Sequence, residues 1–112
     1  MKRIDAIVRH DRLDAVRESL IALGHHGLTV TEVRGHGLQK GLTQQWRGKP
    51  YSVNLLPKVH VMAVVHDHEV HDAVQAICSV ARTGMIGDGK IFVSPVETAI
   101  RIRTGEDGAD AL

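Results

Sequence analysis

Residues 2–24, KRIDAIVRHDRLDAVRESLIALG, combine the two apolar periods on which the predicted fold is built. Alternate apolar residues in 2–9 predict a half-buried strand. Apolar residues then recur at helical spacing up to Gly24, which is a suitable helix stop. Asp11 is placed to cap this helix by accepting a bond from an amide of its first turn. The strand face is Ile4, Ala6 and Val8, and the helix stripe is Leu13, Val16, Leu20 and Leu23.

The same order of strand and helix returns in the second half of the chain. The β-branched run LLPKVHVMAVV (55–65) precedes a helical stripe in EVHDAVQAICSVAR (69–82), and Gly84 follows as a stop. Both halves carry His-Asp between strand and helix, so Asp67 is the second candidate cap. The second stripe is Val70, Val74, Ile77, Cys78 and Ala81. The remaining predicted strands are LTVTEVRG (28–35), KIFVSP (90–95) and AIRIR (99–103).

This doubled strand–helix–strand pattern predicts an α+β, ferredoxin-like fold, in which two helices cover one face of an antiparallel sheet. With 112 residues, the chain is expected to form one domain over residues 1–112. The opposite sheet face would need a partner, and other copies of the chain would bury it, so we expect a homo-oligomer. The acidic tail from about residue 105 to 112 is expected to be flexible.

One long connection, GHGLQKGLTQQWRGKPYSVN (35–54), shows neither apolar period. It carries four glycines, three basic residues and the chain's only Trp and only Tyr, Trp46 and Tyr51. Structureless connections longer than about 12–15 residues are usually functional or disordered. Because binding groups concentrate on loops held by a rigid scaffold, we favour a functional loop over a disordered connector.

Composition excludes several classes of function. The net charge of +1 argues against broad electrostatic capture of nucleic acid. A single cysteine, Cys78, rules out an internal disulfide and a cysteine-based zinc cage, and we expect it to be buried on a helix. No stretch approaches the ~20 apolar residues of a membrane span, and the first residues lack a signal-peptide core. We therefore expect a cytoplasmic protein without membrane insertion.

Three groups of residues are suited to an anionic ligand. Glycine turns at 35–37 (GHG) and 84–90 (GMIGDGK) allow backbone amides to face a phosphate, and Lys90 adds a positive charge. Arg101 and Arg103 would share one face of the predicted last strand and suit a polyphosphate. The third group, suited to a small carboxylate, stands at the feet of the long loop: Gln39, Lys40 and Lys58. Ordinary turns and solvated surface charges explain the same patterns equally well.

Other chemistries have weaker support. A strand rather than a helix follows Lys90, and no Ser or Thr succeeds it, so this is not a Walker-type loop. The spacing His66-x-His68-x-x-His71 fits a transition-metal site or a solvated helix start. No recognisable nucleophile motif is present, so we do not expect an enzyme.

Four stretches resemble the PII signal-transduction proteins. TGMIGDGKIFVSPVETAIRIRTGE (83–106) looks like the C-terminal signature of that family. WRGKPYSVNLLPKV (46–59) is similar to the signature of its T-loop, which corresponds here to residues 36–54. GHGLQKGLT (35–43) matches a further family stretch with substitutions, and LTVTEV (28–33) another. The resemblance covers essentially the whole chain.

The resemblance implies a homotrimer with long T-loops and with ATP or ADP, or AMP, bound in the three clefts between subunits. Phosphates would be held by Gly87, Asp88, Gly89 and Lys90, joined by Arg101 and Arg103 from across the cleft. Further residues near the nucleotide would be Thr29, Gly35, Gly37 and Val64. Gln39 would bind Mg²⁺, which enters with ATP and recruits the small metabolite 2-oxoglutarate.

The family also implies how such a protein senses and signals. Arg9, Lys40 and Lys58, with Gln39, would neutralise the dicarboxylate. Tyr51 corresponds to a tyrosine that bacterial members use for uridylylation or adenylylation. Arg47 corresponds to a loop-tip arginine that plugs an ammonium channel. The T-loop would then regulate a nitrogen-metabolism enzyme or a membrane transporter.

Departures from the family pattern support an alternative. Leu38 stands where an arginine reaches the ATP phosphates, and Met62 replaces a glutamate near the adenine. His10-Asp11 replaces Pro-Phe beside the effector site, and three residues near Tyr51 also differ: Trp46, Lys49 and Pro50. These changes fit a specialised paralogue that prefers ADP or AMP and senses another anion, such as bicarbonate. A metal-binding trimer that uses the histidines is a further alternative.

Overall fold

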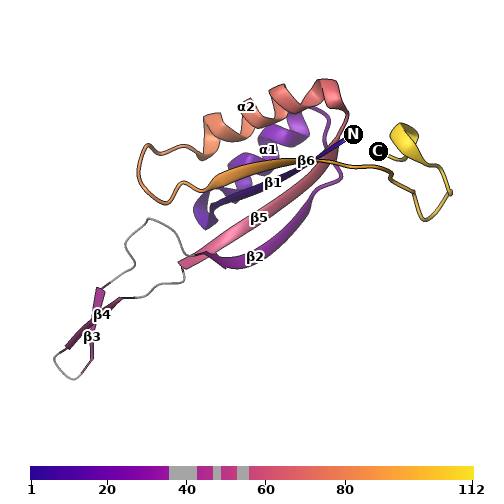
Figure 1. Ribbon diagram of the computed structural model, residues 1–112. Helices are drawn as coiled ribbons and strands as arrows, with labels where there is room; N and C mark the ends of the chain where they lie inside the picture. Colours follow the sequence, from indigo (N-terminus) through magenta and orange to yellow (C-terminus); the bar gives the residue numbers. More distant parts are fainter. Residues whose placement is uncertain (36–42, 47–48, 53–55) are drawn as a thin grey trace.

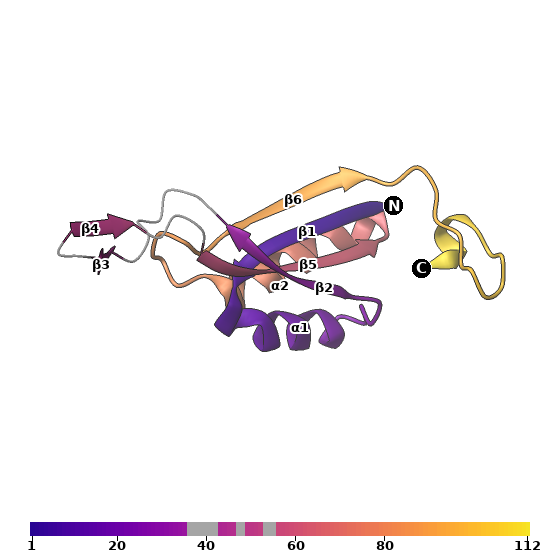
Figure 2. The same cartoon turned by 90° about the horizontal axis from the view of Figure 1, so that it is seen from below.

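The computed structural model describes residues 1–35, 43–46, 49–52 and 56–112. Four strands form one antiparallel sheet in the order β2-β5-β1-β6, and two helices lie on one face of it (Figures 1 and 2). The strands are β1 (Lys2–Arg9), β2 (Thr29–Gly35), β5 (Leu56–Val65) and β6 (Lys90–Pro95), and the helices are α1 (Leu13–Ala22) and α2 (Val70–Ala81). The predicted ferredoxin-like arrangement is confirmed.

The core lies between the sheet and the helices. β1 and β5 run side by side, with Val8 opposite Val59 and Ile4 opposite Ala63, so their alternate residues point together toward the helices. The core residues are Ile4, Ala6, Val8, Val16, Leu20, Val59, Val61, Ala63, Val65, Ala73, Ile77 and Ala81. The predicted stripes are confirmed except at Leu23, which follows the end of α1 and is 43% exposed, and at Cys78, which is only half-buried.

A 3-10 turn precedes each α-helix. The turn η1 (His10–Arg12) leads directly into α1, and η2 (Asp67–Glu69) leads directly into α2. The predicted cap at Asp11 is wrong, because this residue already lies inside η1 and makes no capping bond. The cap at Asp67 is wrong for the same reason. Its carboxylate pairs instead with the N-terminal ammonium at 2.8 Å and with Lys2 at 3.5 Å. The cap bond belongs to Glu69, whose Oε1 accepts from the His66 amide at 3.0 Å.

The long connection between β2 and β5 is not structureless throughout. It contains a two-stranded hairpin, β3 (Thr43–Trp46) and β4 (Lys49–Ser52), which projects beyond the end of the sheet in Figure 1. The pairing places Thr43 opposite Ser52 and Trp46 opposite Lys49. An antiparallel pair satisfies the backbone polar groups of an extended segment without apolar alternation, which explains why the sequence period did not reveal it.

The predicted strand at 99–103 is not formed. Ile100 makes one isolated bridge with Asp107, and the chain then turns so that the Gly105 amide bonds the Arg101 carbonyl at 2.7 Å. A strand needs a neighbour to pair with. This segment continues past the end of β6, beyond the sheet, and Ile102 is 98% exposed. The predicted flexible tail carries the short helix η3 (Gly108–Ala111).

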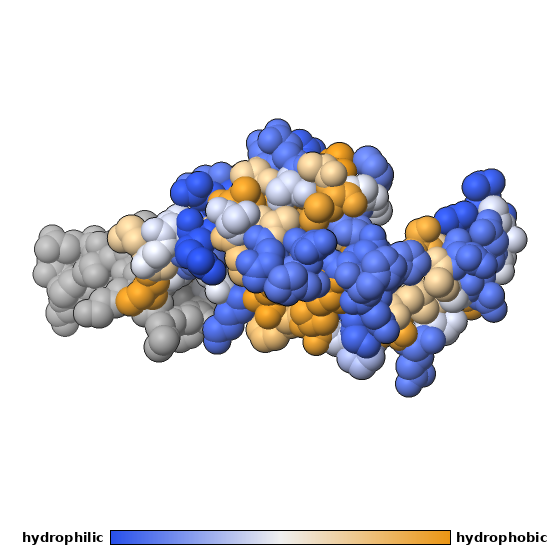
Figure 3. Space-filling view, turned by 90° about the horizontal axis from the view of Figure 1, so that it is seen from above, coloured by the Kyte–Doolittle hydropathy of each residue, from blue (hydrophilic) through white to orange (hydrophobic). Residues whose placement is uncertain are grey.

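The outer surface is mixed in character. Seen from the side of α2, hydrophilic residues alternate with smaller hydrophobic patches (Figure 3). Cys78, predicted to be buried, is only half-buried on α2. In the described part of the chain, no helix combines the length and apolarity that crossing a membrane would require.

Candidate functional site

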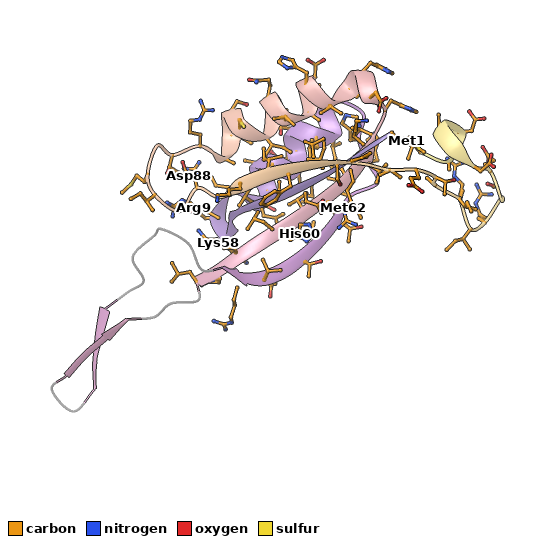
Figure 4. The ribbon with its side chains drawn as sticks, in the orientation of Figure 1. Met1, Arg9, Lys58, His60, Met62 and Asp88 are labelled. Carbon is orange, nitrogen blue, oxygen red and sulfur yellow. The ribbon has the colours of Figure 1, made fainter. Side chains whose placement is uncertain are left out.

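Basic side chains and a glycine turn meet at one end of the sheet. Arg9 ends β1, Lys58 stands near the start of β5, and residues 83–89 connect α2 to β6. Figure 4 shows Arg9, Lys58 and Asp88 together at the end from which the β3–β4 hairpin projects, whereas Met1 lies at the opposite end. The antiparallel topology produces this meeting, because the end of β1 and the starts of β5 and β6 share one edge.

The turn at 83–89 is built around the side chain of Asp88. Its Oδ2 accepts bonds from the amides of Thr83 at 2.8 Å and Gly84 at 2.9 Å, and its Oδ1 accepts from the Thr83 hydroxyl. The same hydroxyl oxygen accepts the Met85 amide at 3.2 Å. The bond from the Thr83 hydroxyl is the main cause that holds the pKa of Asp88 far below its usual value, with the Thr83 amide, Arg9 and the Gly84 amide adding to it. Asp88 is therefore ionised at neutral pH.

The second half of the turn presents backbone rather than side chains. Gly87 and Gly89 both have positive φ, at 103° and 100°. Among the described residues, none accepts a hydrogen bond from the amides of Gly87, Asp88 or Gly89. Successive amides flanked by glycines of this kind form an anion-binding nest, and Lys90 follows directly with an exposed side chain. This half of the turn can therefore receive an anion.

Two cations brace the turn from the strands. Arg9 donates from Nε to Asp88 Oδ1 at 3.1 Å and from Nη2 to the Ile86 carbonyl at 2.8 Å. Lys58 Nζ donates to the Gly87 carbonyl at 2.5 Å, and the Lys58 side chain is buried. Burial is the main cause that lowers the pKa of Lys58, and the charge of Arg9 lowers it further. The charges of Asp88 and Asp11 act in the opposite direction, and an anion bound beside this pair would likewise favour the charged form of Lys58.

Two hollows flank this end of the sheet. One, of about 390 Å³, is lined by residues at the ends of β1, β2 and β5, including His10, Glu32 and Lys58. The other, of about 270 Å³, lies between α2 and β6 and includes Cys78, Asp88 and Lys90 in its lining. The 390 Å³ hollow has the more polar lining residues. It adjoins Gly35 at the foot of the long loop, and a Cβ added at Gly35 would stand 3.2 Å from Lys58 Cγ.

The predicted nucleotide residues fall into two groups in one copy of the chain. Gly35 and the turn residues Gly87–Lys90 lie at the hairpin end of the sheet. Thr29, opposite Met62, and Val64 lie further along, since Val64 is six residues from Lys58, or about 20 Å of strand. The two arginines of the C-terminal segment follow β6, which leads away from the turn toward the end marked by Met1.

Arg101 is engaged within its own segment, where Nη1 bonds Glu106 Oε1 at 3.1 Å and Nη2 bonds the Leu112 carbonyl at 3.3 Å. Arg103 lies in the adjacent turn and is exposed. One copy therefore does not bring these arginines to its own glycine turn. Four predicted residues lie outside the described residues: Gly37, Gln39, Lys40 and Arg47. Tyr51 lies on β4, with its backbone opposite Gln44.

Two features were missed in the sequence. The first is the pairing of Thr83 with Asp88, for which the only sequence signal is a threonine five residues before an aspartate across a glycine turn. The second is an ionic cluster on the sheet face that no helix covers. There Asp5 accepts from Arg3 Nε at 2.9 Å and lies 2.7 Å from His60 Nε2. The bond from Arg3 is the main cause that lowers the pKa of Asp5.

The histidines near α2 do not converge on a metal site. His66 and His68 stack with ring centroids 5.7 Å apart, and His25 Nε2 lies 4.0 Å from Glu69 Oε2. Across the described residues, no group of three or more His, Cys, Asp or Glu is arranged to hold a metal ion. Metal binding by His66, His68 and His71 has no geometric support here.

Comparisons with known proteins agree along the whole chain. The family model described as nitrogen regulatory protein P-II matches residues 1–106. A nitrogen regulatory protein P-II of Cereibacter sphaeroides is 57% identical over 112 residues, covering all of both chains. One from Pasteurella multocida (strain Pm70) is 55% identical over the same length, again covering all of both. A nitrogen regulatory protein P-II 2 of Methanothermobacter thermautotrophicus is 51% identical over all of this chain and 97% of its own.

Proposed function

Because this chain belongs to the family of nitrogen regulatory proteins P-II, we propose that it binds ATP or ADP in clefts between the subunits of a homotrimer and senses 2-oxoglutarate. A regulatory protein of this family acts on other proteins, and the proposed output arm is the T-loop, residues 36–54. The observation that carries the proposal is the glycine turn, where three successive amides without an acceptor among the described residues stand before Lys90. Such a turn fits a phosphate chain.

The proposal predicts direct nucleotide binding by the pure protein. Isothermal titration calorimetry with ATP, ADP and AMP measures it, and Lys90→Ala removes the point charge beside the turn. We expect Lys90→Ala to weaken ATP binding by about tenfold or more, as the loss of a charge-assisted contact does. Absence of binding by all three nucleotides to the wild-type protein would refute the proposal.

The composite site is supported by the separation of its two groups of residues. The glycine turn and Arg101 lie toward opposite ends of one copy, so a complete site would join the turn of one subunit to the arginines of another. Mixing two inactive variants tests this arrangement. We expect Lys90→Ala and the double variant Arg101→Ala/Arg103→Ala each to bind poorly, while co-refolded mixtures recover a fraction of wild-type sites. Mixed assemblies that fail to recover binding contradict a shared site.

Sensing of 2-oxoglutarate is supported by Arg9 and Lys58, which lie together beside the polar hollow at the foot of the loop. Two cations at this spacing suit a dicarboxylate, and Lys40 and Gln39, with Mg²⁺ carried by ATP, would complete the set. Tighter ATP binding in the presence of 2-oxoglutarate and Mg²⁺ is the expected result. Lys58→Met should abolish this enhancement more strongly than it weakens ATP binding alone.

A specialised paralogue is the second candidate, and Met62 favours it. Met62 stands opposite Thr29 in the register, within the group of residues predicted near the adenosine, and it cannot accept a hydrogen bond as a carboxylate does. Preference for ADP or AMP over ATP, together with no response to 2-oxoglutarate, would support this candidate, and bicarbonate is the anion to test next. Met62→Glu should then change the selectivity for the base and leave the preference among ATP, ADP and AMP unchanged, because all three carry the same adenine.

The projecting β3–β4 hairpin supports an output arm that docks on an enzyme or a membrane transporter. Tyr51 lies on this hairpin and is the proposed site of uridylylation or adenylylation. Incubation with a nucleotidyltransferase and mass spectrometry of the wild type and Tyr51→Phe tests the modification. A mass increase of the wild type that Tyr51→Phe lacks is the expected result.

A further inference from the structure

The side chain of Asp88 has surroundings that differ from those of a phosphate ligand. Its two oxygens already accept bonds from the Thr83 amide and hydroxyl, the Gly84 amide and Arg9 Nε. A carboxylate so occupied has little capacity left for a ligand. Its negative charge would also repel a phosphate at short range. The contribution of Asp88 to an anion site must therefore come through something other than direct contact by its side chain.

What the carboxylate does instead is close the turn on itself. It ties residue 88 back to residues 83 and 84, and the Thr83 hydroxyl extends the tie to the Met85 amide. These bonds consume the amides of the first half of the turn. The amides of the second half, from Gly87 to Gly89, have no acceptor among the described residues. The division between the two halves runs through Asp88 itself.

The carboxylate also ties the turn to the sheet. Arg9, at the end of β1, bonds both Asp88 Oδ1 and the Ile86 carbonyl, so its guanidinium spans the middle of the turn. Gly89 fixes the far end, because its Cα approaches the Ile7 carbonyl so closely that a Cβ would stand 1.7 Å from that oxygen. The turn is thereby held against β1 at its middle and at its far end.

We propose that Asp88 is a positioning residue, which together with Thr83 sets the backbone of residues 83–89 so that the amides of Gly87–Gly89 are preorganised for a phosphate. The inference deepens the proposed nucleotide site and rests on it. Preorganisation raises affinity because the ordering of the turn is complete before the ligand arrives. Thr83, which contacts the second half of the turn only through the side chain of Asp88, then becomes a determinant of nucleotide affinity.

Isosteric variants separate positioning from contact. Asp88→Asn keeps the shape but replaces one acceptor oxygen with a donor that opposes the amides of Thr83 and Gly84. Positioning predicts that ADP affinity falls by about tenfold or more. If Asp88 instead only lay near the phosphates, Asp88→Asn would raise the ADP affinity, because removal of its charge would relieve repulsion. Glu18→Gln, an exposed change on α1, controls for the loss of one negative charge.

Thr83 supplies the second pair of variants. Thr83→Val removes the hydroxyl at nearly constant shape and is expected to weaken ADP binding, whereas Thr83→Ser keeps the hydroxyl and is expected to restore it. Equal affinities for the valine and serine variants would overturn the inference. So would an Asp88→Asn variant that binds ADP as tightly as the wild type or more tightly.

A measurement without nucleotide makes the test independent of the proposed function. Amide hydrogen exchange, followed by NMR, reports the protection of Thr83 and Gly84 in the free protein. Faster exchange at both amides in Asp88→Asn, with unchanged exchange in the β1 core at Ile4, is expected. If the wild type binds no ADP, the proposed function fails, while unchanged exchange at Thr83 and Gly84 would separately refute the role of Asp88.

Discussion

Gly89 combines a positive φ with a close approach to the backbone of β1, so a side chain at this position would disturb both the glycine turn and the sheet. Its φ of 100° lies in a region that residues with a side chain rarely adopt. A Cβ there would stand 1.7 Å from the Ile7 oxygen and 2.8 Å from the Ile7 carbonyl carbon. Both are backbone atoms of β1 and cannot rotate aside. Gly89→Ala must therefore move the turn away from β1 by more than about 1 Å, judged against normal van der Waals contact.

The expected cost follows from two contributions. Strain at a positive φ amounts to about 1–3 kcal/mol. Loss of backbone bonds at the adjoining pair, Ile7 opposite Lys90, adds about 0.5–1.5 kcal/mol for each bond. The free energy of unfolding should therefore fall by about 2–5 kcal/mol, a large part of the ~5–15 kcal/mol typical of a domain. Gly84→Ala is the matched control, because Gly84 has a φ of 86° but nothing within 4 Å of its Cβ position.

Urea unfolding followed by circular dichroism, at one protein concentration, measures both variants against the wild type. Gly84→Ala should show the strain alone, and Gly89→Ala should lose more than Gly84→Ala with a similar m value. Equal losses for the two variants would refute the reasoning, because the close approach to β1 would then be easily relieved. Nucleotide binding by Gly89→Ala should fail even in the fraction that remains folded.

Three further outcomes follow from contacts outside the turn. The bonds of Asp5 to Arg3 and His60 lower its pKa, so they stabilise the fold at neutral pH and are lost as the pH falls through that lowered pKa. In acid titrations Asp5→Asn should therefore be less stable than the wild type at pH 7, and the difference should shrink as the pH falls through the lowered pKa of Asp5. Ile77→Ala should cost about 2–5 kcal/mol in urea unfolding, since the side chain is 1% exposed, and a loss below 1 kcal/mol would show that the core relaxes around it. Glu69→Ala should cost about 0.5–2 kcal/mol by removing the bond from the His66 amide, with Glu69→Gln retaining part of it.

The fold was predictable because its apolar periods are local and repeated. Alternation over residues 2–9 and helical spacing over 13–20 identify β1 and α1, and the same order in the second half fixes the second unit. The helix starts were less predictable. Aspartates after the strands resemble caps, but each already stands inside a 3-10 turn. The cap position is Arg9, two residues before Asp11, in the first turn, and His66, one residue before Asp67, in the second.

The segment at 99–103 shows a different limit. Its alternation of Ile and Arg is typical of a strand, but alternation predicts only on which face of the strand each side chain would lie. Pairing requires a neighbouring strand, and one copy of the chain supplies none beyond β6 at that position. The sequence therefore identified residues suited to a phosphate, Arg101 and Arg103, without locating them relative to the glycine turn.

Within the site, the sequence predicted which charged residues take part but not how their side chains are oriented. The sequence and its resemblance to the family single out Lys58, Arg9 and the glycine turn, and in the structure both cations contact the turn. That Asp88 faces Thr83 depends on the conformation of the eight residues between α2 and β6, which no periodicity encodes. The conformation of such a loop depends on its contacts with the surrounding strands, so it cannot be predicted from the loop sequence alone.

The projecting hairpin has a consequence for solution scattering. The radius of gyration of the chain is 17.0 Å, against about 13 Å for a compact chain of this length. The longest dimension, 60 Å, is more than twice the next, 27 Å. Because each atom contributes by the square of its distance from the centre, the two projecting parts, the hairpin of β3 and β4 and the segment after β6, both add to this excess. Small-angle X-ray scattering therefore offers a direct monitor of this arm: a ligand that folds it against the sheet would shorten the tail of the distance distribution, whereas one that extends it would leave the tail intact.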